Sequence, residues 1–148
     1  MQLDELPIVS KIIFTTEEIK TISKFITDNE NKIKDLVKSN SLTNAFKSYN
    51  FLNSEIGDLL KQKILKFLKE QKVEKPLYIQ CWSNVFRKNE GIGLHKHADD
   101  LDKFLCANIF IDGDENIGTT YIINNKPFNI KNTKGEITLF NSQIPHRS

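Results

Sequence analysis

The chain has 148 residues, of which 39% are hydrophobic and 27% charged, and its formal net charge is +2. This size and composition are typical of one globular domain and exclude a disordered or membrane protein. No apolar run approaches the roughly 20 residues of a membrane-spanning helix, the N-terminus lacks the segments of a signal peptide, and the small charge gives no argument for nucleic acid. We therefore expect a single cytoplasmic domain over 1–148 with no membrane or nucleic-acid partner; the oligomeric state stays open.

The first half of the chain, residues 1–75, has a helical pattern. Thr15 and Glu18 have the spacing of a capping box, in which each side chain accepts a hydrogen bond from the other's backbone amide. Apolar residues then recur at helical intervals as far as Ser39. The polar run 27–31 predicts a break that divides this region into two helices.

A further helix is predicted from Asn53 or Ser54 to about Gln71. Lysines on its other face indicate a solvated surface rather than a basic binding helix. Its predicted apolar stripe consists of Ile56, Leu59, Leu60, Leu65, Phe67 and Leu68.

From residue 76 onward the pattern changes to short stretches rich in β-branched and aromatic residues, separated by Gly, Asn, Asp and Pro. The predicted strands are 77–86, 104–111, 119–124 and 136–140. Several short strands joined by tight turns favour an α+β protein with an antiparallel sandwich or barrel and helices packed on one sheet. Cys81 and Cys106, the only cysteines, fall in these strands, so we expect reduced, buried thiols.

The three histidines of the chain, His95, His97 and His146, all lie in this second half. Residues two apart in extended backbone point to the same side, so His97 and Asp99 can face one interior. A histidine from a later strand can complete a facial set of two imidazoles and one carboxylate. Such a set leaves adjacent coordination positions open, as non-haem Fe(II) oxygenases require.

Other interpretations of these residues stay open at this point. Asp99 and Asp100 can instead cap a turn, and His146 can be solvated. His95 is an alternative third ligand, which would give a three-histidine site like that of some cupins, without a 2-oxo acid; otherwise it supports one of the ligands or is exposed. A further alternative is an inactive barrel that serves as an interaction domain.

The motifs resemble those of the 2-oxoglutarate/Fe(II)-dependent oxygenases of the prolyl-hydroxylase-like superfamily, most closely a small branch found in marine bacteria and their phages. The segments that carry the resemblance are 82–97, 104–113 and 134–148, with Trp82, Asn84, Gly135 and Phe140 among the matching positions. The resemblance implies a double-stranded β-helix, a jelly-roll or cupin-like barrel. It also implies Fe(II) on His97, Asp99 and His146, 2-oxoglutarate and dioxygen as cosubstrates, ascorbate as a further candidate reductant, and hydroxylation of an unidentified protein, peptide or small molecule.

Four polar residues are candidates for binding the 2-oxo acid. Tyr78, Gln80 and Asn84 share one face of a predicted strand, and would contact the ligand if that face lines the barrel; otherwise they face solvent. Asn108 lies among apolar neighbours, and a buried amide needs hydrogen-bond partners.

The sequence departs from the family pattern after His146. The family carries an Arg or Lys about ten residues later that pairs with the far carboxylate of 2-oxoglutarate, whereas this sequence ends at Ser148. We expect Arg147 to point away from the pocket, and Lys103 and Lys126 are weaker substitutes. The final barrel strand is therefore expected to be missing, through truncation, completion by a partner chain or loss of activity.

Overall fold

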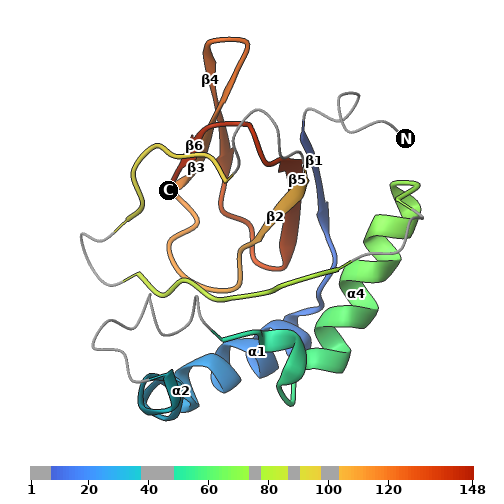
Figure 1. Cartoon of the computed structure of the whole chain (residues 1–148), viewed down its shortest axis with the longest axis vertical. Coiled ribbons are helices and arrows are strands. Elements are labelled where there is room, and N and C mark those ends of the chain that lie inside the picture. The colour runs from blue at the N-terminus through green and yellow to red at the C-terminus, as the bar shows by residue number, and fades with distance from the viewer. Residues whose placement is uncertain (1–7, 38–48, 74–77, 87–90, 98–103) are drawn as a thin grey trace. The chain divides into compact units, whose positions relative to one another are not determined.

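The computed structural model describes residues 8–37, 49–73, 78–86, 91–97 and 104–148 (Figure 1). The chain divides into two compact units. The described residues within Met1–Ile19 and Glu90–Ser148 form the first unit, and those within Lys20–Asn89 form the second. Each unit is described by itself.

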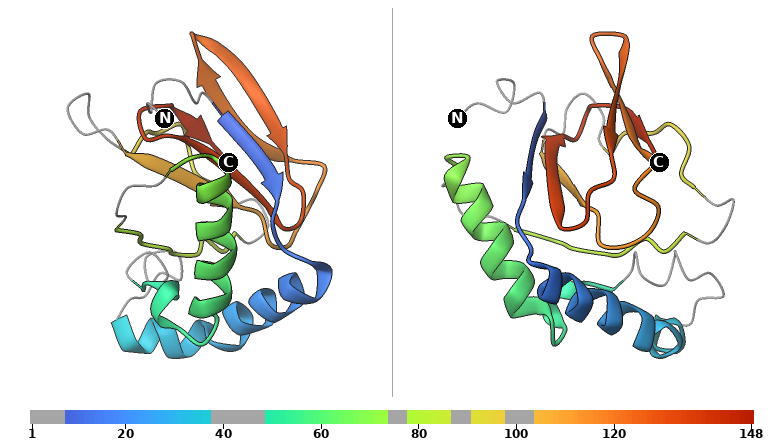
Figure 2. Two further views of the ribbon diagram at one scale, coloured as in Figure 1. Left: turned by 90° about the vertical axis from the view of Figure 1, so that its right-hand side faces the viewer. Right: turned by 180° about the vertical axis from the view of Figure 1, so that it is seen from behind.

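The first unit contains an antiparallel sheet of three strands in the order β1-β5-β2 (Figures 1 and 2). These strands are β1 (Ile8–Ile12), β5 (Glu136–Asn141) and β2 (Leu105–Ile109). β5 is the central strand, and its side chains from Ile137 to Asn141 are buried on both faces. β2 and β5 had been predicted, whereas β1 lies in the half of the chain that was predicted to be helical.

A second antiparallel sheet has the order β4-β3-β6, with β3 (Gly118–Ile123), β4 (Lys126–Lys131) and β6 (His146–Arg147). An isolated bridge between His95 and His146 adds the segment around His95 beside β6. The two sheets contact each other through the rings of Tyr121 on β3 and Phe140 on β5, whose centroids are 5.1 Å apart. This contact brings side chains of both sheets into one core.

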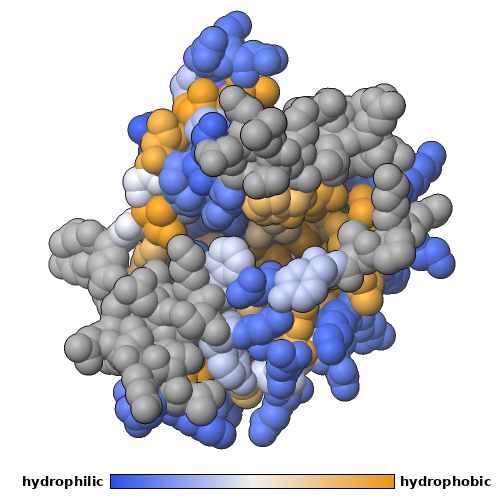
Figure 3. All heavy atoms as spheres, in the orientation of Figure 1, coloured by the Kyte–Doolittle hydropathy of each residue, from blue (hydrophilic) through white to orange (hydrophobic). Residues whose placement is uncertain are grey.

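The β3–β4 hairpin turns at Asn124 and Asn125, which have φ values of 50° and 63°. Two central residues with positive φ define the turn type that best matches the twist of paired strands. β4 was missed because Pro127 resembles a strand breaker, but proline is tolerated on an edge strand such as this one. The projecting end of the hairpin is hydrophilic (Figure 3).

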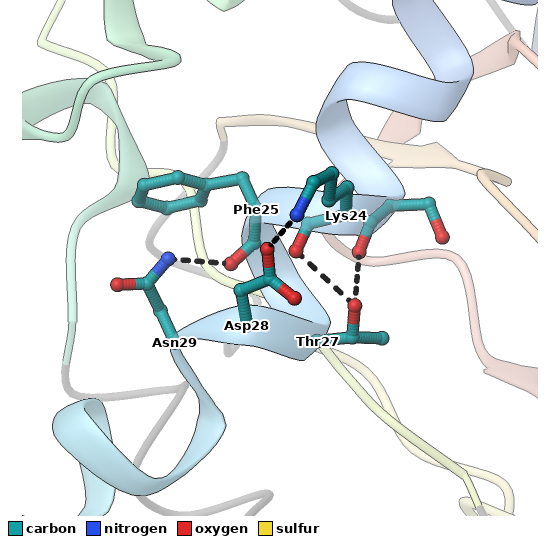
Figure 4. A network of polar contacts seen from close by, with 6 residues as sticks. Lys24, Phe25, Thr27, Asp28 and Asn29 are labelled. Atoms are coloured by element: carbon teal, nitrogen blue, oxygen red, sulfur yellow. Dashed lines mark hydrogen bonds and ion pairs between the residues drawn. The ribbon is translucent and has the colours of Figure 1, made fainter.

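The second unit is helical, with α1 (Thr16–Asp28, which begins in the first unit), α2 (Glu30–Val37) and α4 (Gly57–Glu70), preceded by the short 3-10 helix η2 (Phe51–Asn53). The predicted break in the first helical region is confirmed at Asn29, between α1 and α2. Its amide Nδ2 donates to the carbonyl of Phe25 at 2.8 Å, beside an ion pair between Lys24 and Asp28 (Figure 4).

The predicted capping box is also confirmed. The Thr15 amide donates to Glu18 Oε1 at 2.9 Å, and the Glu18 amide donates to Thr15 Oγ1 at 3.2 Å. These bonds satisfy two backbone donors at the start of α1 that have no partner within the helix.

The predicted helix over 53–71 corresponds to α4, which starts at Gly57. The predicted stripe was wrong at Leu65, which is 46% exposed. At 3.6 residues per turn, Leu65 lies on the side opposite the stripe, and Ile64 takes its place among the buried residues.

The predicted strand over 77–86 was wrong for residues 78–86, which form no strand. This segment is held instead by Asn50 and Phe51. The amide of Phe51 donates to the carbonyl of Cys81 at 2.8 Å, and the amide of Cys81 donates to Asn50 Oδ1 at 3.2 Å. Both cysteines are free thiols, as predicted, but each is only half-buried, whereas buried thiols had been expected.

The α+β class is confirmed by two antiparallel sheets and several helices. Within the described residues, no helix is long and apolar enough to cross a membrane. The packing of the helices on one sheet, the single domain and the cytoplasmic location stay predictions.

Candidate metal centre

The site is built on the pairing of His95 with His146. The His95 amide donates to the His146 carbonyl at 3.0 Å, and the His146 amide donates to the His95 carbonyl at 2.9 Å. Side chains of directly opposed residues lie on the same face of a sheet. Their ring centroids are accordingly 4.4 Å apart.

His97 joins this pair because it lies two residues beyond His95. The His97 amide donates to the carbonyl of Ser142 at 3.0 Å, which keeps this segment beside the residues that precede β6. The His97 ring centroid is 5.1 Å from that of His95 and 4.9 Å from that of His146. The same-side rule used to predict the site therefore holds for His95 and His97.

Backbone carbonyls fix the orientation of two of the rings. His95 Nδ1 lies 2.7 Å from the carbonyl oxygen of Gly93, and His146 Nδ1 lies 3.0 Å from that of Ile144. A carbonyl oxygen can only accept, so Nδ1 carries the proton in both rings. In a neutral ring Nε2 then carries no proton, so it can accept a hydrogen bond or bind a metal ion, and an Nδ1–H bond to a carbonyl is the usual support of a metal-bound histidine.

His146 is the most enclosed member of the cluster, with 3% of its surface exposed. Burial lowers the pKa of His146, the bond to Ile144 opposes this effect, and the nearby His95 lowers the pKa further. The neutral ring, which is the form that binds a metal ion, is therefore favoured.

The spacing of the ring nitrogens suits a metal ion. His97 Nε2 and His146 Nε2 are 3.1 Å apart. Two nitrogen ligands about 2.1 Å from an ion and at a right angle are about 3.0 Å apart. One nitrogen from each of His95, His97 and His146 lies within 4.8 Å of the others. The three histidines could therefore hold a metal ion.

Comparison with known proteins identifies no relative. No family model, curated protein or solved structure matches this chain. What the site can do therefore has to be argued from its own residues and from the motifs described above.

The predicted ligands have different outcomes. The structure brings His97 and His146 together, and it adds His95, the predicted alternative. Asp99 lies outside the described residues, as does Lys103. Whether the third ligand is Asp99 or His95 stays open.

The predicted 2-oxo acid contacts are divided between the two units. Tyr78, Gln80 and Asn84 are exposed in the second unit, and Tyr78 is 91% exposed. This exposure matches the interpretation in which they face solvent within their own unit. Their role in binding stays a prediction.

Asn108 lies in the first unit with the histidines, and its amide Nδ2 donates to Tyr121 Oη at 3.1 Å. Tyr121 was missed by the sequence reasoning. It is 1% exposed, lies in register with His146 on the neighbouring strand, and its ring centroid is 5.8 Å from that of His146. The sequence does show a tyrosine within an alternating strand, which could have been considered as a candidate. Only the pairing of β3 with β6 shows that Tyr121 lies beside the histidines.

Two basic residues considered from the sequence are exposed. Arg147, which had been expected to point away from the pocket, is exposed on β6, and Lys126 is exposed at the start of β4.

Burial raises the pKa of Tyr121 to about 12, and the Asn108 bond opposes this effect. The phenol therefore stays protonated at neutral pH.

Proposed function

We propose that the protein is a non-haem Fe(II) oxygenase that uses dioxygen and 2-oxoglutarate to hydroxylate a substrate. The observation that carries this proposal is the convergence of His95, His97 and His146 on one point from two separate parts of the chain. Among the divalent ions that imidazole binds well, Fe(II) fits an incomplete ligand set that leaves positions for a cosubstrate.

The strand order supports a jelly-roll barrel as the fold that carries this centre. From the His95 segment, the chain passes to β2 in the first sheet, to β3 and β4 in the second, to β5 in the first and to β6 in the second. Repeated crossing between two facing antiparallel sheets is typical of jelly rolls. The double-stranded β-helix implied by the family resemblance has this arrangement.

His97 and His146 would hold the iron in either ligand set, with Asp99 or His95 as the third ligand. When bound, Fe(II) supplies the activation of dioxygen for substrate oxidation. The chain's own part is to orient the imidazoles through the carbonyls of Gly93 and Ile144, and to enclose the ion against buried side chains.

A second candidate is a three-histidine metal centre without a 2-oxo acid. The observation that favours it is the bond from His95 Nδ1 to the Gly93 carbonyl, which leaves His95 Nε2 available as a ligand. In this candidate His95 is the third ligand and Asp99 has no role.

Anaerobic titration with Fe(II) and then 2-oxoglutarate distinguishes the two. We expect one Fe(II) per chain and, on adding 2-oxoglutarate, a weak visible charge-transfer band that arises only when the 2-oxo acid chelates the iron. Succinate, which lacks the keto group, is the matched control. Stoichiometric iron without the band supports the second candidate, and no stoichiometric metal contradicts both.

A further inference from the structure

A pocket lined by both polar and apolar side chains lies between the two sheets of the first unit. Its lining includes Asn108, Thr119, Tyr121, Lys131, Glu136 and Thr138. Asn108 and Thr138 are cross-strand partners on β2 and β5, whereas Thr119 and Tyr121 come from β3. Phe110 and Ile130 also line it, and Lys131 is exposed, but hydroxyls, an amide and two opposite charges make the lining more polar than the apolar side chains that normally lie between two sheets.

Tyr121 connects this pocket with the histidine cluster. Its ring lies against His146, with centroids 5.8 Å apart, and it also lines the pocket, where its hydroxyl accepts the Asn108 hydrogen bond. A ligand in the pocket would therefore lie one side chain away from the candidate metal centre.

The two charged residues of the pocket are not paired. Neither Lys131 nor Glu136 forms an ion pair with any residue that the structure describes. Burial raises the pKa of Glu136. A carboxylate that is partly removed from water without a counter-charge is costly, so a ligand that supplies a cation there gains binding energy.

From this arrangement we infer that the pocket binds a small amino carboxylate, such as a free amino acid, with the ligand's ammonium group at Glu136 and its carboxylate at Lys131. The hydroxyls and the Asn108 amide complete the hydrogen bonds of the ligand. That such an amino carboxylate is also the substrate of the oxygenase rests on the proposed function. The binding itself requires no metal.

The test is a series of ligand titrations of the whole metal-free chain, in which binding is measured by calorimetry or by NMR chemical-shift changes. The probes are glycine, β-alanine and 4-aminobutanoate, which separate the two charged groups by increasing distances. Acetate, propanoate, butanoate and the corresponding amines are single-charge controls. Because a hydrogen bond to a charged group is worth a factor of about ten or more, we expect one amino carboxylate to bind about tenfold more tightly than its matched acid and amine.

Two variants assign the ends of the ligand. Glu136→Gln should reduce the affinity for the amino carboxylate to that for the matched acid, and Lys131→Met should reduce it to that for the matched amine. Lys126→Met, a lysine on the same strand that does not line the pocket, is the matched control and should change nothing.

Three outcomes overturn the inference: no amino carboxylate exceeds its single-charge controls, succinate or 2-oxoglutarate binds more tightly than every amino carboxylate, or Lys126→Met weakens binding as much as Lys131→Met. Iron content of the wild-type chain is measured separately. Absence of iron would contradict the proposed function alone, whereas failure of the binding series in an iron-retaining chain would contradict only the pocket assignment.

Discussion

His95 and His146 lie directly opposite each other on antiparallel segments, and each backbone amide donates to the other's carbonyl. The residues are distant in sequence, yet this pairing brings their imidazole rings to 4.4 Å between centroids. The site therefore depends on strand register, because a slip by one residue would turn one ring to the opposite face.

Removing His146 should abolish metal binding in both proposed ligand sets, since this residue belongs to each. We expect His146→Ala to retain no stoichiometric Fe(II) after anaerobic dialysis, measured by elemental analysis. His95→Ala should also abolish iron binding if the three histidines are the ligands. Asp99→Ala should do so if the Asp99 carboxylate is the third ligand. Stoichiometric iron in folded His146→Ala, with folding checked by circular dichroism, would contradict the centre.

Tyr121→Phe should destabilise the first unit. The change leaves the half-buried Asn108 amide without the acceptor it has in the wild type, and loss of a typical hydrogen bond costs about 0.5–1.5 kcal/mol. Urea denaturation measures the free energy of unfolding. As a control, Asn129→Ala removes an exposed bond to Thr120 Oγ1 and should change stability by less than about 0.5 kcal/mol; equal effects would show that the Asn108–Tyr121 bond contributes no more than an exposed one.

Gly135→Ala should be destabilising, because Gly135 has a φ of 81° and an added Cβ would lie 2.9 Å from the backbone oxygen of Phe14. A left-handed non-glycine residue with such a contact costs of order 1–3 kcal/mol. Gly93→Ala is the matched control, since its Cβ would meet nothing within 4 Å. Thermal melts of the metal-free proteins should separate the two variants.

The capping box should contribute measurably to α1. Thr15→Ala removes the acceptor for the Glu18 amide, and loss of an N-cap side chain typically costs about 1 kcal/mol. Thr16→Ala, one residue into the helix, is the comparison. An equal or larger loss of stability in Thr16→Ala would show that the cap bond contributes little.

Both thiols should react slowly in the folded protein. Burial raises the pKa of Cys81 and of Cys106 to about 11. The reactive thiolate is then scarce at pH 8, and the rate should rise about tenfold per pH unit until the pH approaches that pKa. A disulfide-exchange reagent measures this rate, and urea should restore the rate of an ordinary cysteine. Rapid reaction of either thiol in the folded chain would be the contrary result.

The sequence by itself determined the local features of this protein. Thr15 and Glu18 predicted a cap, the polar run 27–31 predicted a helix break, and the alternating segments predicted β2, β3 and β5. These features depend on neighbours within a few residues, so local chemistry is sufficient to predict them.

Only the tertiary structure decided which distant groups meet. Residues 78–86 have the composition of a strand, yet in their own unit they are held by Asn50 and Phe51 and form none. The positions of Tyr121 and His95 beside His146 follow from strand pairing, which no local pattern contains. Register is set by hydrogen bonds and packing between segments far apart in the chain. The histidines therefore suggested a site, but the sequence could not predict which residues lie together in it.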